Sequence, residues 1–441
     1  MKLTAFEEYM LLDSHPAYPM SCFLGLTFKG NFDFGTFTAA ANAAVLLHPL
    51  LSSTAEKIPS GSFRWQHHPT PVTISEKPFD PDRCFPAATG IDLFKEPPLK
   101  ITVCRESEQT THVSVEIHHS ACDAAGCSRF VEDLFVEYAK RNGMTVTSER
   151  ESVKTELLPN RGKYGLTLAT WLRIFPRQLW GLTRAWMFLF NRVEPLVAVP
   201  VLLDSSTPPD SFPAVLVKTF SKEETLQIRR QAKTAGETLN DVAIIAVFES
   251  LATCNSQLAT SGYFRIAVPT NLRTDEDRLM SAANIVSMVF IDRKPNRVAD
   301  TASFRNGICG EMLHIKRCRL GLALIHGLRI YRHVFGSFTK MIRRDKCWTT
   351  ATVSNLGVMF SEVPLLRRDG KICFGNGLEL AEVISVPPIR PQTVFGICVL
   401  TYAEKLSVNV HYDSSVVTQS DAEKFLDETV KCFDNHLTYH S

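Results

Sequence analysis

The stretch IHHSACDAAG, residues 117–126, combines the residue types in this sequence that are best suited to acid–base chemistry. It places His118 and His119 side by side and puts Asp123 four residues after the second histidine. An imidazole with an ordinary pKa of about 6.5 titrates near neutral pH and can serve as a general base. The aspartate could contact that ring, or it could pair with an arginine and hold the loop.

The residues before this loop predict a β-strand over 111–119. Side chains alternate between the two faces of a strand, so adjacent histidines point to opposite sides and only one can face a given cavity. His119 falls on the apolar face, whereas His118 falls on the face that carries Glu116. We therefore expect His119 to be the functional histidine and His118 to be a supporting residue.

After Asp123 an apolar stripe with helical spacing predicts a helix that ends before Gly143. Asp123 falls near the start of this helix, where Ala124, Ala125 and Gly126 are small enough for tight packing. A strand, a short loop and a helix place a side chain at the mouth of a sheet, where α/β proteins build their sites. A lone histidine on an apolar face could also be a hydrogen-bonded core residue.

Two other kinds of chemistry are not indicated. A metal site would need additional His, Asp or Glu ligands at fixed spacing, and the cysteines do not have the spacing of a zinc site. A serine nucleophile is not expected because the sequence has no GxSxG motif. A second histidine pair, His67 and His68, lacks a following aspartate and precedes Pro69, so we interpret it as an edge or a loop.

The chain of 441 residues is too long for one small core. Its composition, 45% hydrophobic and 21% charged, is typical of a folded globular protein. Strands and helices mix in both halves, which predicts an α/β fold of two similar lobes, each with a mixed sheet flanked by helices. We expect an N-terminal lobe over 1–160, a crossover linker over 161–205 and a C-terminal lobe over 206–441.

Hydrophobic periods and capping signals predict the main elements of both lobes. Before the loop we expect strands over 22–29 and 99–104 and a helix over 36–47. After the linker we expect strands over 214–220, 263–269 and 284–292, a helical region over 301–344, and a hairpin over 393–412 that turns near Glu404. Helix caps are predicted from the spacing of Ser221 with Glu224, Thr238 with Asp241 and Ser420 with Glu423.

The linker holds three of the five tryptophans in a stretch that is apolar apart from a narrow polar stripe. We expect a helix that Pro176 opens and Pro195 closes. Its uninterrupted run of about 18 residues is at the lower limit for a membrane span and contains arginines, so we do not expect it to cross a membrane. It could be a helix packed between the lobes, or an interfacial helix that touches lipid through 171–190.

The net charge of +2 is unevenly distributed along the chain. Residues 161–200 carry a net charge of +5 and residues 313–346 a net charge of +8, which leaves −11 for the rest. Such basic, apolar segments suit an anionic ligand or an anionic membrane surface, or they form solvated helix faces. The twelve cysteines lack a CxxC motif and the N-terminus lacks an apolar run, so we expect free thiols and a cytoplasmic protein.

Five segments of the sequence match motifs of one known superfamily. The first three are HHSACDAAG, which resembles an HHxxxD motif, LHPLL (47–51) and TLNDV (238–242). IAVPTNLR (266–273), with Asn284 in the next strand, and SNLG (354–357) follow in matching order over nearly the whole chain. Together they resemble the chloramphenicol acetyltransferase-like acyltransferases, which include nonribosomal peptide condensation domains, polyketide-associated acyltransferases, plant HxxxD acyltransferases, alcohol acetyltransferases and bacterial wax ester synthases.

This resemblance implies two related α/β lobes with a tunnel between them and a histidine at its middle. It implies that His119 is the general base, and that Asp123 is structural and pairs with Arg273. Ser354 and Asn355 would line the opposite side of the tunnel. There they would help to hold a developing oxyanion, or they would only stabilise a turn.

The sequence departs from the family pattern in two places. Ala124 stands where many relatives have glycine, and the DFGWG motif of the plant enzymes is absent. Alanine is small and Gly126 follows two positions later, so we expect the loop to keep its shape. No carrier, adenylation or second condensation domain is recognised in the sequence, which favours a stand-alone transferase.

The reaction implied by the resemblance is transfer of an acyl group from a thioester to an alcohol or amine. The donor would be acyl-CoA or an acyl-phosphopantetheine on an acyl carrier protein, so no metal or bound cofactor is expected. One alternative is a membrane-associated lipid O-acyltransferase of the wax ester or diacylglycerol type, with peripheral membrane contact. The other is a non-catalytic, condensation-like binding protein. We expect a monomer that binds no nucleic acid.

Overall fold

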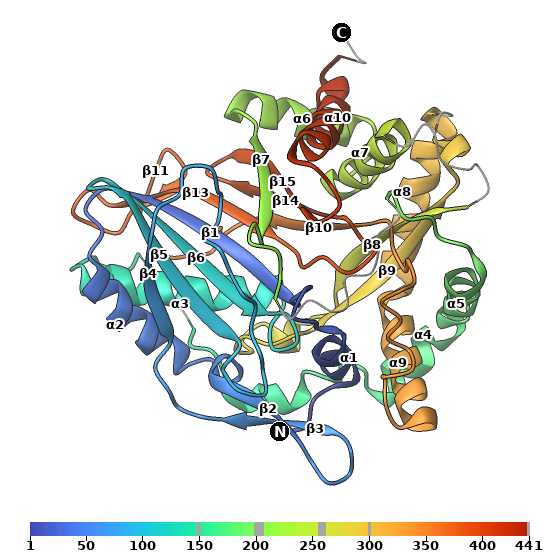
Figure 1. Cartoon of the computed structure of the whole chain (residues 1–441), viewed down its shortest axis with the longest axis horizontal. Helices are drawn as coiled ribbons and strands as arrows, with labels where there is room; N and C mark the ends of the chain where they lie inside the picture. Colours follow the sequence, from blue (N-terminus) through green and yellow to red (C-terminus); the bar gives the residue numbers. More distant parts are fainter. Residues whose placement is uncertain (148–150, 198–206, 255–261, 299–300, 439–441) are drawn as a thin grey trace.

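The computed structural model describes residues 1–147, 151–197, 207–254, 262–298 and 301–438. Two large sheets dominate it, one in each lobe (Figure 1). The first has the strand order β13-β1-β6-β5-β4, and the second has the order β7-β15-β14-β10-β8-β9. Helices flank both sheets, so the predicted two-lobed α/β fold is confirmed.

The first lobe contains the strand and helix that enclose the histidine loop. Its elements are α1 (Ala5–Asp13), β1 (Ser21–Lys29), α2 (Phe34–Val45), β2 (Ser53–Lys57), β3 (Phe63–His67), β4 (Thr73–Pro78), β5 (Leu99–Ser107), β6 (Thr110–His118) and α3 (Ala124–Arg141). The apolar face of β6, formed by Val113, Val115 and Ile117, is buried in one core with α2 and α3. The predicted alternation along β6 is therefore confirmed, and the apolar face lies under the two helices.

The part of the chain after the linker contains a longer set of elements. These are β7 (Ala214–Thr219), α6 (Lys222–Thr234), α7 (Leu239–Cys254), β8 (Phe264–Asn271), β9 (Val286–Arg293), α8 (Thr301–Cys318), α9 (Gly321–Phe335), β10 (Ala351–Val358), β11 (Arg367–Arg368), β12 (Lys371–Ile372), β13 (Glu379–Val386), β14 (Phe395–Tyr402), β15 (Lys405–Tyr412) and α10 (Gln419–Thr438). Almost the whole circumference of α7 is buried, in a core that it shares with the second sheet. The predicted hairpin is confirmed as β14 and β15, with Ala403 and Glu404 at its turn.

One strand of the C-terminal half belongs to the other lobe. β13 pairs antiparallel with β1, so it forms an edge of the first sheet. Gly25 of β1 is in close contact there, because a Cβ atom on it would lie 2.7 Å from Cγ1 of Ile384. The proposed boundary between 205 and 206 therefore does not divide the strands between the two sheets, because β13 follows the boundary but belongs to the first sheet.

The linker contains two helices where the sequence suggested one. α4 (Leu168–Gln178) begins after Thr167, whose hydroxyl accepts the N–H of Thr170, and α5 (Trp180–Phe190) follows it. Pro176 therefore lies inside α4 and does not open a helix. Proline has no N–H to bond to the preceding turn, and α4 ends two residues later. The last part of the predicted linker, residues 198–205, lies outside the described residues.

Two further helix predictions need correction. The helical region expected over 301–344 is two helices, α8 and α9, and the second ends at Gly336 in the left-handed conformation that glycine adopts readily. The cap of the last helix is Thr418 with Asp421, and not Ser420 with Glu423, because Asp421 supplies the carboxylate that accepts the Thr418 hydroxyl. No helix among the described residues is long and apolar enough to cross a bilayer.

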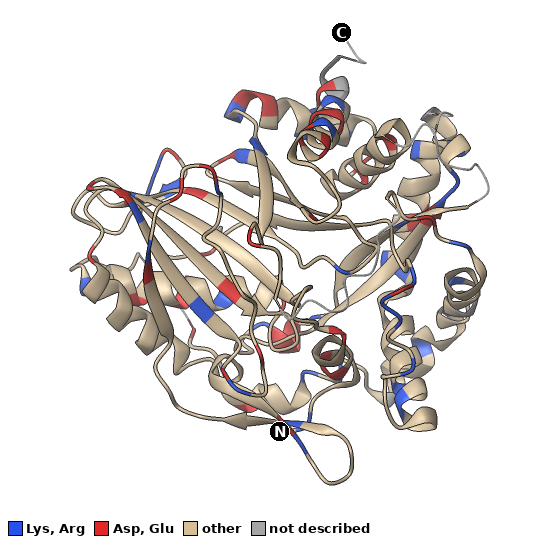
Figure 2. Ribbon diagram, viewed as in Figure 1, with Lys and Arg blue, Asp and Glu red and all other residues tan. Residues whose placement is uncertain are grey.

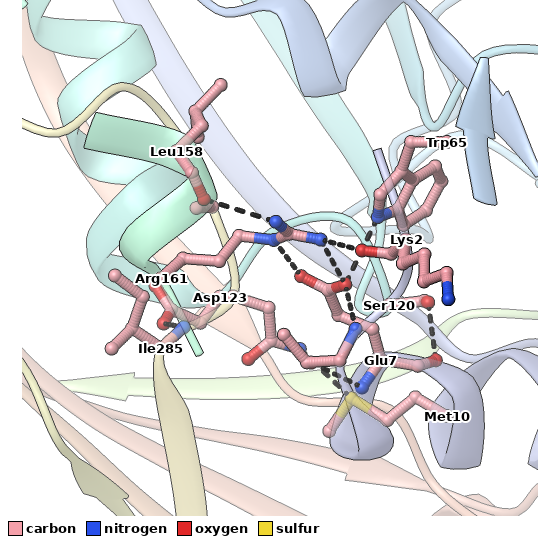
Figure 3. A network of polar contacts seen from close by, with 12 residues as sticks. Lys2, Glu7, Met10, Trp65, Ser120, Asp123, Leu158, Arg161 and Ile285 are labelled. Atoms are coloured by element: carbon pink, nitrogen blue, oxygen red, sulfur yellow. Dashed lines mark hydrogen bonds and ion pairs between the residues drawn. The ribbon is translucent and has the colours of Figure 1, made fainter. Parts of the chain in front are cut away.

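A buried ion pair joins the start of the chain to the start of the linker (Figure 3). Arg161 donates to both carboxylate oxygens of Glu7, at 2.6 and 2.8 Å, and also to the carbonyl oxygens of Lys2 and Leu158. The indole N–H of Trp65 donates to the same carboxylate at 3.2 Å. Both charges are thus enclosed and well supplied with partners, a condition under which a buried pair is tolerated.

Removing the cation of this pair should destabilise the protein severely. Arg161→Ala leaves the Glu7 carboxylate buried without its counter-charge, which costs about 3–5 kcal/mol of unfolding free energy. Urea titration followed by circular dichroism measures this loss. Arg64→Ala removes an exposed pair with Glu56 and should change stability little, because solvent screens such a pair. Equal losses in the two variants would contradict the assignment.

Candidate active site between the two lobes

His119 stands at the end of β6 beside a cavity between the lobes. The cavity has a volume of about 420 Å³, and its lining includes His119, Arg273, Ser354 and Asn355. The backbone N–H of His119 donates to the carbonyl of Met20 at 2.7 Å. This bond holds the backbone of His119 against the residue that precedes β1. The ring is half-buried, and its Nδ1 atom is enclosed without a hydrogen bond of ordinary geometry. The backbone of His119 is therefore fixed, and the residue borders the cavity.

The environment of His119 favours the neutral imidazole. Burial lowers the pKa of this ring. The backbone of His119 and Cys122 and the nearby carboxylate of Asp123 oppose that shift only in part. A histidine with a lowered pKa is unprotonated at neutral pH, which is the form that can accept a proton.

His118 points away from the cavity and is almost completely buried, at 1% exposure. Its Nδ1 accepts the backbone N–H of Ser120 at 3.2 Å, so the ring helps to shape the turn after β6. Burial, together with the neighbouring His119, lowers the pKa of His118 to about 3. The two histidines thus occupy opposite faces, as the alternation predicts, and His118 contributes to the fold of the loop.

Asp123 uses both carboxylate oxygens to hold the loop and the lobes together. It caps α3, because its Oδ1 accepts the N–H of Gly126 at 2.8 Å. Its Oδ2 accepts Nη1 of Arg273 at 2.7 Å and the N–H of Ile285 at 2.7 Å (Figure 3 shows Asp123 with Ile285). The pairing with Arg273 that the resemblance implied is present, and the carboxylate is directed to the second lobe instead of the imidazole.

The ion pair determines the protonation state of Asp123. Burial alone would raise the pKa of this carboxyl, but the charge and hydrogen bonds of Arg273, with the N–H groups of Gly126 and Ile285, lower it below its usual value. Arg273 also donates to the carbonyl of Ala283 at 2.9 Å. The carboxylate is therefore ionised, and the arginine connects it to the segment that precedes β9.

Asn284 is a site residue whose role the sequence did not indicate. The sequence placed it in the strand after VPTNLR, but the structure shows its Nδ2 donating to the carbonyl of His119 at 2.6 Å. On the other side of the same segment, Ala282 donates its N–H to Nδ1 of the buried His48, from the LHPLL stretch, at 2.9 Å. Residues 282–285 of the second lobe thus bond to the first lobe at several points. Contacts between segments so distant in sequence leave no local signal.

Ser354 and Asn355 line the cavity from β10 in the second lobe. Asn355 Oδ1 accepts the N–H of Gly357 at 2.9 Å, so this side chain stabilises the bend at the end of β10. Both residues are half-buried. They border the same cavity as His119, and both the expected placement on the opposite side of a tunnel and the oxyanion role stay predictions.

The rest of the cavity wall combines apolar, thiol and charged groups. Cys22 and Cys398 contribute thiols, and burial raises the pKa of both to about 12, so they are protonated. Arg129 and Arg278 line another part of the wall together with the carboxylates of Glu132 and Glu362, among other residues. Within the described part of the chain, no three His, Cys, Asp or Glu side chains gather as a metal would require.

Gly126 permits the close approach of the two lobes at the loop. A Cβ atom at this position would lie 2.8 Å from the carbonyl oxygen and 2.9 Å from the nitrogen of Ala283, and 2.7 Å from Sγ of Cys122. Backbone atoms cannot rotate away as a flexible side chain can. A glycine at position 126 is therefore required by the contact between the lobes.

Gly126→Ala should loosen this contact. We expect a loss of about 1–3 kcal/mol of unfolding free energy from overpacking, measured by chemical denaturation. The matched control is Gly310→Ala in α8. A Cβ atom there would have no atom outside the helix's own backbone within 4 Å, and alanine should stabilise the helix by about 1 kcal/mol. If Gly126→Ala were as stable as that control, the lobes would not meet as described.

His118 should make the fold sensitive to acid. Its pKa is about 3 in the folded chain and about 6.5 when unfolded, so its contribution is complete above pH 6.5 and is lost as pH falls towards 3. His118→Asn keeps an acceptor for Ser120 without a titrating ring. The wild type should therefore lose up to about 1.4 kcal/mol more per pH unit than this variant within that window. Parallel pH profiles of unfolding free energy would contradict the burial of a neutral ring.

Comparison with known proteins shows which solved structures share this fold. No family model matches the sequence, and no curated protein sequence matches it. Among solved structures, the first condensation domain of the calcium-dependent antibiotic synthetase has a TM-score of 0.68 at 14% identity, covering 99% of this chain and 96% of that one. The TRI3 trichothecene 15-O-acetyltransferase from Fusarium sporotrichioides has a TM-score of 0.67 at 12% identity, covering 98% and 94%.

A further similar structure is the condensation domain of the monacolin K polyketide synthase MokA, with a TM-score of 0.66 at 12% identity, covering 99% of this chain and 97% of that one. The chain thus has the fold of the condensation domains and of this acetyltransferase over its whole length. This is the two-lobed fold that the resemblance of the motifs implies. Similarity at this level of identity defines the fold, and the activity has to be argued from the site.

Proposed function

We propose that this protein transfers an acyl group from a thioester to an alcohol or amine, with His119 as the general base. The observation that carries the proposal is the position of a neutral, half-buried imidazole on an interlobe cavity. The fold is shared with condensation domains and with an O-acetyltransferase, which supports acyl transfer as the reaction class. No observation favours a non-catalytic binding protein.

The proposed reaction needs one proton to move twice. His119 takes the proton of the acceptor O–H or N–H while the acceptor atom attacks the thioester carbonyl carbon. The C–S bond then breaks, and the imidazolium gives the same proton to the departing thiolate. The products are an ester or amide and a free thiol, so no covalent acyl-enzyme and no redox partner are required. Ser354 would donate to the carbonyl oxygen as negative charge develops on it.

The structure of the loop supports this role for His119. The backbone bonds to Met20 and Asn284 fix the position of the residue, while the Asp123–Arg273 pair fixes the turn that follows. Fixing the base before the substrates arrive reduces the ordering needed during reaction. Asp123 and Arg273 are positioning residues in this proposal because they act through the loop and do not touch the reacting atoms.

The donor would carry its own handle, coenzyme A or the phosphopantetheine of a carrier protein. Arg129 and Arg278 in the cavity wall are candidate partners for an anionic donor. All twelve cysteines lie among the described residues and are free thiols, which is in keeping with a reducing cytoplasm. A lipid acceptor is the second candidate, and the exposed surface considered below favours it.

His119→Ala should abolish turnover while the fold persists. We expect the rate to fall by about 10²–10⁴-fold, the usual contribution of general acid–base catalysis. The assay incubates acetyl-, hexanoyl- and palmitoyl-CoA with a panel of alcohols and amines, and it measures free thiol together with product mass. His68→Ala, from the other histidine pair, is the matched control and should keep full activity.

Three outcomes would contradict the proposal. One is a His119→Ala variant with a wild-type rate. Another is a wild type that forms no ester or amide with this panel or with the corresponding acyl carrier proteins. The third is a stable increase in protein mass, equal to one acyl group, under turnover conditions, because that would indicate an acyl-enzyme in place of direct transfer.

A further inference from the structure

The linker helices expose an unusual number of large apolar side chains. Those that are at least one-third exposed on α4, on α5 and at the break between them are Trp171, Leu172, Phe175, Leu179, Trp180, Trp186, Leu189 and Phe190. The most exposed, Trp186, is 65% exposed. We call this set the linker face. The helices that carry it, α4 and α5, lie along one edge of the molecule, at the right in Figure 1.

The opposite side of α4 and α5 already packs against the rest of the protein. The helices therefore cannot rotate to bury the linker face. Ile174 is buried, and Gln178 donates to the carbonyl of Cys318 at 2.7 Å. Gly181 lets α5 approach α9 so closely that a Cβ atom on it would lie 2.9 Å from Cβ of Ala323. Arg184 pairs with Glu311 of α8. The exposed side chains are thus held outward by a fixed scaffold.

The exposed aromatic rings pack on one another. Trp171 and Phe175 have centroids 4.7 Å apart, and Trp186 and Phe190 have centroids 4.1 Å apart. Each pair has helical i, i+4 spacing, so it forms a continuous apolar ridge on its helix. The last turns of α9, which packs beside α5, expose Ile330, Val334 and Phe335 in addition. Exposed apolar surface of this extent usually marks an interaction site.

The charged residues on α4, α5 and α9 themselves are all basic, and the nearest acids, such as Glu311 and Glu8, are already paired with arginines. Residues 161–193 contain six Lys or Arg and no Asp or Glu, and residues 312–344 of α8, α9 and the following segment also contain no acid. The charged positions along α4, α5 and α9 are accordingly blue in Figure 2. Arg173 and Arg177 of α4 and Arg329 of α9 are exposed. An occupant of this surface has to be apolar and anionic at once.

We propose that the linker face binds the surface of an anionic lipid bilayer. Tryptophan, phenylalanine and leucine side chains enter the boundary between headgroups and acyl chains, while arginines meet the headgroup phosphates. A second copy of the chain is a poor occupant, because a symmetric contact would bring two basic surfaces together. An acidic protein would satisfy the charges but would also need an apolar surface to cover the exposed indole and phenyl rings.

This inference concerns where the protein works and stands whether or not the proposed acyl transfer is correct. If both hold, the bilayer would supply an apolar acceptor or acyl donor. The binding test therefore needs no turnover. Failure of binding would leave the chemistry of His119 untouched, and failure of catalysis would leave membrane binding untouched.

Co-sedimentation with vesicles tests the proposal directly. The full chain should bind vesicles of phosphatidylcholine mixed with phosphatidylglycerol, bind pure phosphatidylcholine more weakly, and lose affinity as salt screens the charges. Arg173→Glu with Arg177→Glu should reduce affinity by at least about tenfold, since each cation near such a surface contributes on the order of 1 kcal/mol. Trp186→Ser with Phe190→Ser should do the same through the apolar contact.

The helix α6 of the second lobe supplies matched controls. Arg229 and Arg230 are exposed there, and Leu226 is 50% exposed. Arg229→Glu with Arg230→Glu, and Leu226→Ser, should leave vesicle binding unchanged. Equal thermal melts of all variants exclude unfolding as the cause of any loss.

Tryptophan fluorescence locates the contact. Trp171, Trp180 and Trp186 lie on the linker face, whereas Trp65 is buried in the first lobe. Brominated lipids should therefore quench the emission of the wild type when it binds. No binding to the mixed vesicles, binding that the linker-face variants leave unaltered, or concentration-dependent dimers that bury the same tryptophans would each overturn the proposal.

Discussion

The carboxylate of Asp123 joins the two halves of this protein beside the histidine loop. It caps α3 in the first lobe and accepts hydrogen bonds from Arg273 and Ile285 in the second. Because it is buried, it can remain charged only while the guanidinium stays beside it. Groups of the second lobe therefore help to hold the loop that carries His119. The same contact that closes the interface places the imidazole on the cavity.

Local sequence signals predicted much of the frame around this contact. Alternation along β6 separated the two histidines, and the caps at Ser221 and Thr238 are present because they depend on residues three positions apart. Local signals failed to fix helix ends where two residues within one turn can both start or end a helix. Pro176 can open a helix or end one, and Thr418 can replace Ser420 as a cap two residues away. Boundaries of this kind depend on tertiary packing, which periodicity does not contain.

The site itself was only partly predictable, for a related reason. The histidine loop could be read from its own residues, but the pairing with Arg273 came from resemblance to a superfamily, since 150 residues separate the partners. The bond from Asn284 to the carbonyl of His119 and the link from His48 to Ala282 also join distant segments. The exposure of the linker helices could not be predicted either. An apolar helix packed between lobes and an apolar helix exposed on the surface can have the same composition.

The placement of β13 has a consequence for how the chain is made. A ribosome delivers the polypeptide from its N-terminus, so β1, β5 and β6 emerge long before residues 379–386. Until that strand arrives, the edge of β1 has unpaired N–H and C=O groups that could join another nascent chain. The first lobe thus cannot be completed during early synthesis. Most of the second lobe must emerge before β13 can join the first sheet. A C-terminally truncated product would lack a strand in the half that carries the histidines, although it would retain every residue of the HHxxxD motif.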